Sequence, residues 1–263
     1  MTAAIIIPAR YASTRLPGKP LLAETGKPLI QHVYEQAAKA RAATRVIVAT
    51  DDERIASAVS AFGGEAVMTS PDHRSGTARV AEAAARLDAD IVVNLQGDEP
   101  EIDHRDLDVL IGIQRREGLF ASTLACRFPH GATGGAGSPD DPSAVKVILG
   151  DALAPGVRRA RYFTRRLCPY PRDRGGAIAA PERYFLHVGV YAFSRRSLSV
   201  FSAAPCGALE AAEQLEQLRI LEMGEAIAVG EVRVAAPGVD TPEDYAAFVR
   251  RFTLAARTQT RDA

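Results

Sequence analysis

Residues 3–21 read AAIIIPARYASTRLPGKPL and combine a buried-looking strand with a loop of unusual length. The apolar run of residues 3–7 predicts the strand. The residues after it include three prolines and Gly18, which exclude a regular element, and three cations, Arg10, Arg15 and Lys19. Ligands of open α/β sheets bind beyond the carboxyl ends of the strands, and guanidinium and ammonium groups suit a polyphosphate. The stretch therefore predicts an α/β fold with an anion site after its first strand.

The first half of the chain alternates apolar runs with helical periodicity, which is typical of a parallel sheet covered by helices. Further strands are expected over residues 46–50 and 91–95, and helices from about Pro28, from Asp51–Glu53 and over 77–87. In the second half the pattern predicts strands over 144–149, 187–194 and 226–234, one long amphipathic helix over 210–223, and a last helix from Thr241.

The composition is that of an ordinary folded protein, with 263 residues, 47% apolar and 24% charged residues, and a formal net charge of zero. A zero net charge gives no general attraction to nucleic acid or to an anionic membrane. The three cysteines, Cys126, Cys168 and Cys206, form no CxxC pair and are expected to be reduced thiols, not zinc ligands. No run approaches the roughly 18 apolar residues of a membrane span. We therefore expect a cytoplasmic protein with no nucleic-acid or membrane partner.

Two acidic turns are candidates for a metal site. The stretch VNLQGDEP, residues 93–100, places Asp98 at the end of a buried strand, where a carboxylate can bind a hard cation such as Mg²⁺. The stretch GVDTPEDY, residues 238–245, places Asp240 just before a helix start. Asp240 is either a cap or turn residue, or a second metal ligand together with Asp98.

A third stretch, DHRSGTARV at residues 72–80, is an irregular approach to a helix. Ser75, Gly76 and the helix N-terminus offer small donors to a flat ring or to a phosphate. The alternative is that Ser75 or Thr77 only caps the helix.

Taken together, the chain resembles the CMP-Kdo synthetase family, the 3-deoxy-manno-octulosonate cytidylyltransferases, from end to end. The resemblance is carried by IIPARYASTRLPGKPL, VATDDERI, DHRSGTARVAE, VNLQGDEP, PSAVKVI, RYFTRR followed by PYPRD, HVGVYAF, LEAAEQLEQLRILEMGE and GVDTPEDY. The first, fourth and last of these are shared in looser form with other sugar nucleotidyltransferases. The LExxExLEQLR segment and the His-x-Gly-x-Tyr strand belong specifically to this family.

The resemblance implies a Rossmann-like nucleotidyltransferase fold, with a mostly parallel central sheet flanked by helices and a smaller acceptor and dimerisation lobe. Residues 1–127 and 224–255 would form the nucleotide-binding lobe, and residues 128–223 the other lobe. The implied reaction transfers CMP from CTP to 3-deoxy-D-manno-octulosonate (Kdo) and releases pyrophosphate, for lipopolysaccharide biosynthesis. Mg²⁺ is the implied cofactor, and the implied assembly is a homodimer.

The resemblance also implies residue roles. Nucleotide binding is assigned to Ala9, Arg10, Arg15, Lys19, Ser75, Gly76 and Gln96. Acceptor binding is assigned to Gln96, Arg165, His187, Glu210 and Gln217. Asp98 and Asp240 would bind the metal, and Arg15, Lys19 and Asp98 would be catalytic. The spacing of seven between Glu210 and Gln217 places both on one face of the expected long helix. No residue is an evident general base.

Two rival functions remain open. The first is cytidylyl transfer to a related acidic sugar, such as an amino-substituted Kdo, a sialic acid or a legionaminic-type sugar. The second is a catalytically silent nucleotide-binding paralogue, which would need a lost metal ligand or phosphate cation, and here all are present. For His187, the residues alone favour a buried core histidine, and only the resemblance makes it an acceptor ligand.

Overall fold

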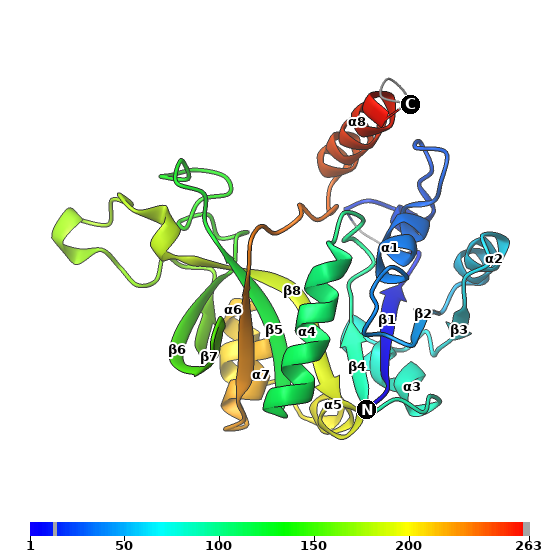
Figure 1. Cartoon of the computed structure of the whole chain (residues 1–263), viewed down its shortest axis with the longest axis horizontal. Coiled ribbons are helices and arrows are strands. Elements are labelled where there is room, and N and C mark those ends of the chain that lie inside the picture. Colours follow the sequence, from blue (N-terminus) through cyan, green and yellow to red (C-terminus); the bar gives the residue numbers. More distant parts are fainter. Residues whose placement is uncertain (13–14, 260–263) are drawn as a thin grey trace. The chain divides into compact units, whose positions relative to one another are not determined.

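The computed structural model of the chain describes residues 1–12 and 15–259, so two residues of the basic loop lie outside it (Figure 1). The chain forms two compact units. The N-terminal unit comprises Thr2–Ala89, Asn94–Leu107 and the chain from Ala236 onward. The central unit comprises Met1, Asp90–Val93 and Asp108–Ala235. The boundaries of these two units differ from those of the two expected lobes. The functional roles of the lobes stay a prediction.

The N-terminal unit contains a parallel sheet of β1 (Ala3–Ala9), β2 (Arg45–Thr50) and β3 (Ala66–Met68), in the order β3-β2-β1. Every residue of β1 is buried, because helices and neighbouring strands cover an entirely apolar run. The strands alternate with α1 (Leu29–Ala37), α2 (Glu53–Ala61) and α3 (Gly76–Ala85). The predicted alternation of strands and helices is confirmed. The short strand β3 was not predicted, since its three residues are not fully buried.

Local sequence signals explain where these helices begin. The Asp52 carboxylate caps α2 by accepting a hydrogen bond from the Arg54 amide at 2.9 Å. The last helix, α8 (Pro242–Gln259), begins with a reciprocal cap, in which the Thr241 hydroxyl accepts from the Asp244 amide and the Asp244 carboxylate accepts from the Thr241 amide. The predicted start of this helix is confirmed.

An apolar cluster ties the start of α8 to the basic loop and to α1. Leu16, Leu29, Val239, Tyr245 and Phe248 are all buried in it. The short 3₁₀ helix η1 (Lys19–Leu21) follows Leu16 directly. Residues 16–19 and 239–240, which are far apart in the sequence, are therefore held side by side by hydrophobic packing.

The central unit contains a mixed sheet in the order β4-β8-β5-β9-β7-β6. Its strands are β4 (Ile91–Asn94, whose last residue belongs to the N-terminal unit), β5 (Ala121–Arg127), β6 (Lys146–Ala154), β7 (Val157–Thr164), β8 (Phe185–Ser194) and β9 (Ile227–Val232). Strands β5 and β9 pair in parallel, whereas β5 with β8, β7 with β9 and β6 with β7 are antiparallel.

The helices of this unit are α4 (His104–Glu117, which starts in the N-terminal unit), α5 (Arg195–Ala203), α6 (Ala208–Glu213) and α7 (Gln217–Glu222), with 3₁₀ turns η2 (Arg172–Arg174) and η3 (Pro181–Arg183). The α4 helix lies along β5, as Figure 1 shows, and Ser122 of β5 donates to the Gln114 side chain of α4 at 2.6 Å. None of the described helices is long and apolar enough to cross a membrane.

The expected single helix over 210–223 is wrong, because the chain breaks it into α6 and α7. Gln214 adopts a left-handed conformation, with φ 53° and ψ 48°, and ends α6. The sequence around it contains no glycine or proline that would have signalled the break. Glu210 and Gln217 therefore lie on two different helices and not on one helix face.

Candidate active site

One pocket of the N-terminal unit gathers the residues that follow β1, the residues that open α3 and the turn after Asn94. All seven residues predicted to bind the nucleotide line it, together with both predicted metal ligands. Its lining is Pro8, Ala9, Arg10, Arg15, Lys19, Pro20, His73, Arg74, Ser75, Gly76, Arg79, Gln96, Gly97, Asp98 and Asp240. Cations outnumber carboxylates in this set, so the pocket favours an anionic ligand.

Lys19 joins the two carboxylates of the pocket. Its Nζ donates to Asp98 Oδ2 at 2.9 Å, to Asp240 Oδ1 at 3.2 Å and to the Val239 carbonyl at 2.9 Å. Only 14% of the Lys19 side chain is exposed, so these contacts are poorly screened by water. Arg15 lies 3.3 Å from the other Asp240 oxygen and is well exposed. Asp98 and Asp240, which the sequence analysis expected to lie together, both contact Lys19, and this contact with Lys19 was not predicted.

The turn before Lys19 explains how its ammonium group reaches this position. Gly18 has φ 69°, a left-handed conformation that glycine adopts without steric cost. Its amide donates to the Tyr11 carbonyl at 3.2 Å, and a Cβ at this position would lie 3.3 Å from the Tyr11 ring. The closed turn starts η1 and directs Lys19 inward.

The donor set fits a divalent cation, judged by its chemistry. Two carboxylates that share one ammonium group can also share one metal ion, and carboxylate oxygens are the ligands that Mg²⁺ prefers. Within the described residues, no group of three or more His, Cys, Asp or Glu side chains could hold a metal. The remaining ligands would then come from substrate phosphates and water, which is the usual arrangement for Mg²⁺.

A third acid, Glu99, follows Asp98 in the chain. Burial, followed by the nearby charges of Asp98 and Asp240, raises the pKa of Glu99 to about 8. Glu99 is therefore mostly protonated at neutral pH, and the negative charge at this place is carried by Asp98 and Asp240.

Two glycines let backbone segments approach closely around the pocket. A Cβ on Gly97 would lie 2.9 Å from the Pro8 carbonyl oxygen, and one on Gly76 would lie 3.2 Å from the Pro8 ring. The end of β1, the start of α3 and the turn after Asn94 therefore meet with little space between them. Gln96 donates to Asn94 Oδ1 at 3.1 Å, and Asn94 donates to the Thr77 hydroxyl at 3.1 Å, which ties the turn to α3.

The alternatives left open for Ser75 and Asp240 have different outcomes. Ser75 is the N-cap of α3, since its Oγ accepts from the Ala78 amide at 3.2 Å, and it also lines the pocket. The Asp240 side chain is not a helix cap, because Thr241 has that role and the Asp240 carboxylate faces Lys19 and Arg15.

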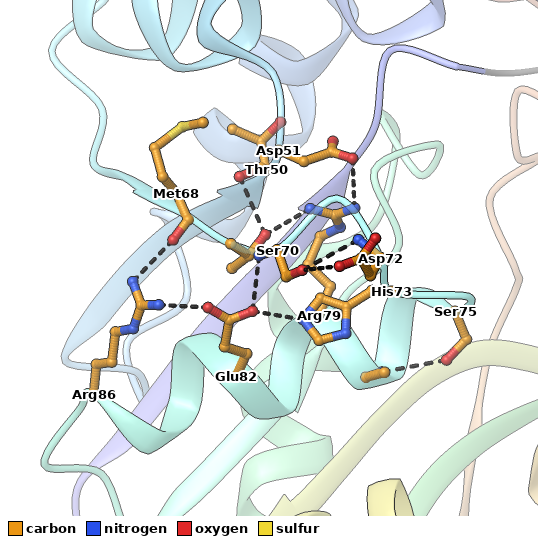
Figure 2. A network of polar contacts seen from close by, with 12 residues as sticks. Thr50, Asp51, Met68, Ser70, Asp72, His73, Ser75, Arg79, Glu82 and Arg86 are labelled. Atoms are coloured by element: carbon orange, nitrogen blue, oxygen red, sulfur yellow. Dashed lines mark hydrogen bonds and ion pairs between the residues drawn. The ribbon is translucent and has the colours of Figure 1, made fainter.

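The sequence analysis missed three cationic or titratable residues of the pocket, His73, Arg74 and Arg79. Arg79 is buried and fixed in place, with its guanidinium 3.0 Å from Asp51 Oδ2 and 2.5 Å from the Thr69 hydroxyl (Figure 2). All three lie in the stretch DHRSGTARV, from which only Ser75 and Gly76 were selected. A basic residue one turn after the helix start was the available signal.

The predicted acceptor residue Arg165 lies in the central unit and binds backbone. Its guanidinium donates to the carbonyls of Glu213 at 2.8 Å, Pro142 at 3.0 Å and Gln214 at 3.4 Å. Its own carbonyl accepts from the buried Lys146 ammonium at 2.8 Å. No carboxylate is paired with this guanidinium among the contacts that the structure describes, and the acceptor role of Arg165 stays a prediction.

His187 of β8 lies between aromatic rings. Its Nε2 is 3.0 Å from the Thr123 hydroxyl, and its ring contacts those of Phe163 and Tyr191. Burial lowers the pKa of His187 to about 3, so the ring is neutral near pH 7 and acts as a hydrogen-bonding group. The Tyr191 hydroxyl beside it is buried and has no hydrogen-bond partner in the described structure. Tyr191 was present in the HVGVYAF motif but was not selected.

Glu210 and Gln217 are both buried. Both carboxylate oxygens of Glu210 accept from the Arg219 guanidinium, which also donates to the carbonyls of Phe201 and Ala204. Burial raises the pKa of Glu210, but the Arg219 hydrogen bond and charge outweigh it and lower that pKa overall. The acceptor roles of Glu210 and Gln217 stay predictions.

A parallel sheet that ends in a cation-lined pocket, with two carboxylates converging on one point, is typical of nucleotide-binding α/β enzymes of the phosphoryl-transfer class. A family model described as Cytidylyltransferase matches residues 4–227, and the chain belongs to this family.

Individual relatives are similar over nearly their whole length. The 3-deoxy-manno-octulosonate cytidylyltransferase of Syntrophobacter fumaroxidans is 50% identical over 93% of this chain and 94% of its own. The 8-amino-3,8-dideoxy-manno-octulosonate cytidylyltransferase of Shewanella oneidensis is 45% identical over 97% of this chain and 100% of its own. A solved structure of CMP:2-keto-3-deoxy-manno-octonic acid synthetase complexed with CTP has a TM-score of 0.84 at 43% identity, covering 98% of this chain and 100% of its own. The expected nucleotidyltransferase fold, with a mixed and largely parallel sheet, is confirmed.

Proposed function

We propose that the protein transfers the CMP group of CTP to 3-deoxy-D-manno-octulosonate and releases pyrophosphate. The observation that carries this proposal is the pocket, which gathers every predicted nucleotide residue in a family whose members at 45–50% identity use this type of acceptor. The reaction supplies an activated acidic sugar for lipopolysaccharide synthesis.

In the proposed nucleotide complex, Arg10, Arg15 and Lys19 bind the triphosphate. Ser75, Gly76 and the backbone at Ala9 frame the base, and Gln96 contacts the nucleotide near the acceptor. As the bond from the α-phosphorus to the bridging oxygen breaks, negative charge grows on pyrophosphate. Arg15 and Lys19 stabilise this charge, which makes them catalytic residues and not merely binding residues.

Asp98 and Asp240 would hold the divalent metal, which we take to be Mg²⁺. When bound, this ion supplies charge neutralisation at the phosphates and lowers the pKa of a nearby hydroxyl. The anomeric hydroxyl oxygen of the acceptor forms the new bond to the α-phosphorus, and its proton passes to solvent. Positioning and charge neutralisation supply most of the acceleration, so a general base is not required.

The acceptor is an acid and needs a cation together with hydroxyl partners. Arg165 would pair with its carboxylate, while Gln96, His187, Glu210 and Gln217 would bind its hydroxyl groups. His187 suits this role because a neutral imidazole can donate or accept a hydrogen bond. We also propose a homodimer in the cytoplasm, where the free cysteines would stay reduced.

A second candidate acceptor is the 8-amino analogue of Kdo, because the Shewanella enzymes that are named for it are similar to this chain at 44–45% identity over nearly the full length. Pyrophosphate release with CTP, Mg²⁺ and each acceptor in turn tests both candidates. We expect Kdo to be used with the higher kcat/KM. A higher kcat/KM with the 8-amino sugar would make that sugar, and not Kdo, the proposed acceptor. If neither acceptor led to pyrophosphate release, the proposed function would be contradicted.

A further inference from the structure

The pocket loop of residues 69–75 connects β3 to α3 and delivers His73, Arg74 and Ser75 to the pocket. It has no regular secondary structure, so its position depends on side-chain contacts. The loop begins at Thr69, whose amide and hydroxyl both donate to the Thr50 carbonyl, at 2.8 and 3.1 Å. It ends at Ser75, the cap of α3. The residues between these two fixed ends, 70–74, need contacts of their own to hold them in place.

Glu82 of α3 supplies that contact, as Figure 2 shows. A single oxygen, Oε2, accepts from the Ser70 amide at 2.9 Å and lies 2.6 Å from His73 Nε2. The other oxygen accepts from Arg86, one turn further along α3. Within the loop, Ser70 and Asp72 are joined by two further hydrogen bonds. One carboxylate thus joins the loop to the helix at two points.

The negative charge of Glu82 determines which group donates in its hydrogen bonds with Ser70 and His73. The Ser70 amide, followed by His73, lowers the pKa of Glu82, so the carboxylate is ionised and only accepts hydrogen bonds. His73 must then carry its proton on Nε2 when it is neutral. Among the described residues that line the pocket, His73 is present and Glu82 is absent. Glu82 therefore acts on a ligand only through other residues, and its contacts with Ser70 and His73 connect it to the loop that lines the pocket.

We propose that Glu82 is a positioning residue for the nucleotide, which acts by holding the Ser70 amide and the His73 ring and thereby fixing the pocket loop. This inference rests on the proposed nucleotide site. The Arg86 ion pair on the far oxygen is not needed for this role, because the Arg86 guanidinium, among the contacts of the described residues, reaches Glu82 and the Met68 carbonyl but no residue of the pocket loop, and its side chain is 54% exposed.

Three variants test this. Glu82→Ala removes both loop contacts, whereas Glu82→Gln keeps one side-chain oxygen that can accept from Ser70 and His73. Arg86→Ala removes the outer ion pair and the hydrogen bond to the Met68 carbonyl but leaves the Ser70 and His73 contacts of Glu82 in place, so it is the matched control. CTP affinity by calorimetry without acceptor, KM for CTP, KM for Kdo and the thermal midpoint are measured for each.

We expect Glu82→Ala to weaken CTP binding by about tenfold or more, because a loop displaced by even a small distance misplaces several ligand contacts. KM for CTP should rise while kcat and KM for Kdo stay within about threefold. Glu82→Gln should recover most of the affinity, and Arg86→Ala should bind CTP within about twofold of wild type.

Two outcomes would overturn the positioning role. One is a Glu82→Ala protein that binds CTP as wild type does. This outcome includes a Glu82→Ala protein in which only the thermal midpoint and kcat change, with CTP binding unaltered. The other is a loss of CTP affinity in Arg86→Ala or Glu82→Gln that equals the loss in Glu82→Ala. A wild-type protein that does not bind CTP at all would instead overturn the proposed function, and the inference with it.

Discussion

Lys19 places one ammonium group between the two carboxylates of the pocket, within 2.9 Å of Asp98 and 3.2 Å of Asp240. The two acids repel each other, and the cation between them offsets that repulsion. A divalent metal that binds the same acids would supply more charge than the ammonium group does. Lys19 would then be released from one or both acids and could turn toward a phosphate.

The first prediction concerns these acids. Asp98→Asn and Asp240→Asn should each reduce turnover with Mg²⁺ by about 100-fold or more, because a carboxamide is a weaker metal ligand than a carboxylate. The fold should survive, since both side chains are partly exposed. Steady-state pyrophosphate release and circular dichroism check the two parts. The control is Asp88→Asn, an exposed acid outside the pocket. A variant within a few-fold of wild type would remove that residue from the metal site.

The second prediction uses the pKa of His187. Burial lowers it to about 3, against about 6.5 in the unfolded chain. The unfolded state therefore binds the proton more readily, and the stability contributed by the neutral ring is lost as pH falls from 6.5 toward 3. Each pH unit in that window should cost about 1.4 kcal/mol at most, or about 2 kcal/mol between pH 6.5 and 5.

Urea unfolding at pH 7 and pH 5 measures this loss. His187→Gln should lose less stability between these two pH values than wild type does, because glutamine does not titrate. His130→Asn, at a histidine whose side chain is 88% exposed, should follow the wild-type dependence. An unchanged pH dependence in His187→Gln would show that His187 is not held neutral.

At the level of elements, the break between α6 and α7 has a tertiary cause. In a continuous helix, the carbonyls of Glu213 and Gln214 would accept from amides four residues later. Here both accept from the Arg165 guanidinium, and the Glu213 carboxylate accepts from the Thr164 hydroxyl at 2.7 Å and the Arg165 amide at 2.9 Å. These contacts with the end of β7 replace the helical bonds and stabilise the break.

The third prediction tests the conformation at this break. Gln214→Gly should raise the free energy of unfolding by up to about 1 kcal/mol, because a left-handed conformation costs about 1–2 kcal/mol for a residue with a Cβ and little for glycine. Gln36→Gly, in the last turn of α1, should have the opposite sign and lower stability by up to about 1 kcal/mol. Both are measured by urea unfolding. A less stable Gln214→Gly protein would mean that this residue is not strained.

Over the whole molecule, the residues that line the candidate nucleotide pocket all belong to the N-terminal unit, whereas Arg165, His187, Glu210 and Gln217 belong to the central unit. Apart from Gln96, which is assigned to both substrates, the two substrates are therefore assigned to residues of two different compact units. Changes in the central unit should alter the use of the acceptor and leave the nucleotide bound as before.

The fourth prediction follows from this division. Arg165→Ala should weaken use of Kdo by about 2–4 kcal/mol in kcat/KM, because a carboxylate loses its cation, and leave CTP affinity by calorimetry nearly unchanged. Lys19→Ala should weaken CTP binding and slow the reaction. Because Arg165 also holds the α6–α7 break, the thermal midpoint of each variant is measured as well. Loss of CTP binding in Arg165→Ala with normal Kdo dependence would contradict the acceptor assignment.

Local patterns in the chain were sufficient for β1, the basic loop, α1 to α3 and the start of α8. Each of these depends on contiguous residues: an apolar run, a cap such as Asp52, or a proline at the first position of a helix. Arg10, Lys19, Asp98 and Asp240, which line the pocket, were also selected, because each stands in the basic loop or at a strand or loop end, where its charge suits an anion or a metal ion.

Contacts between distant residues depended instead on the tertiary fold. Lys19 meets Asp98 and Asp240 from 79 and 221 positions away, and hydrophobic packing of Leu16 with Val239 brings them together. The break at Gln214 and the support of the pocket loop by Glu82 have no signal in their own segments, because the partners that make them favourable lie elsewhere in the chain or across a turn. A residue's type and neighbours predict its local conformation, but its hydrogen-bond partner is set by which strands and helices pack together.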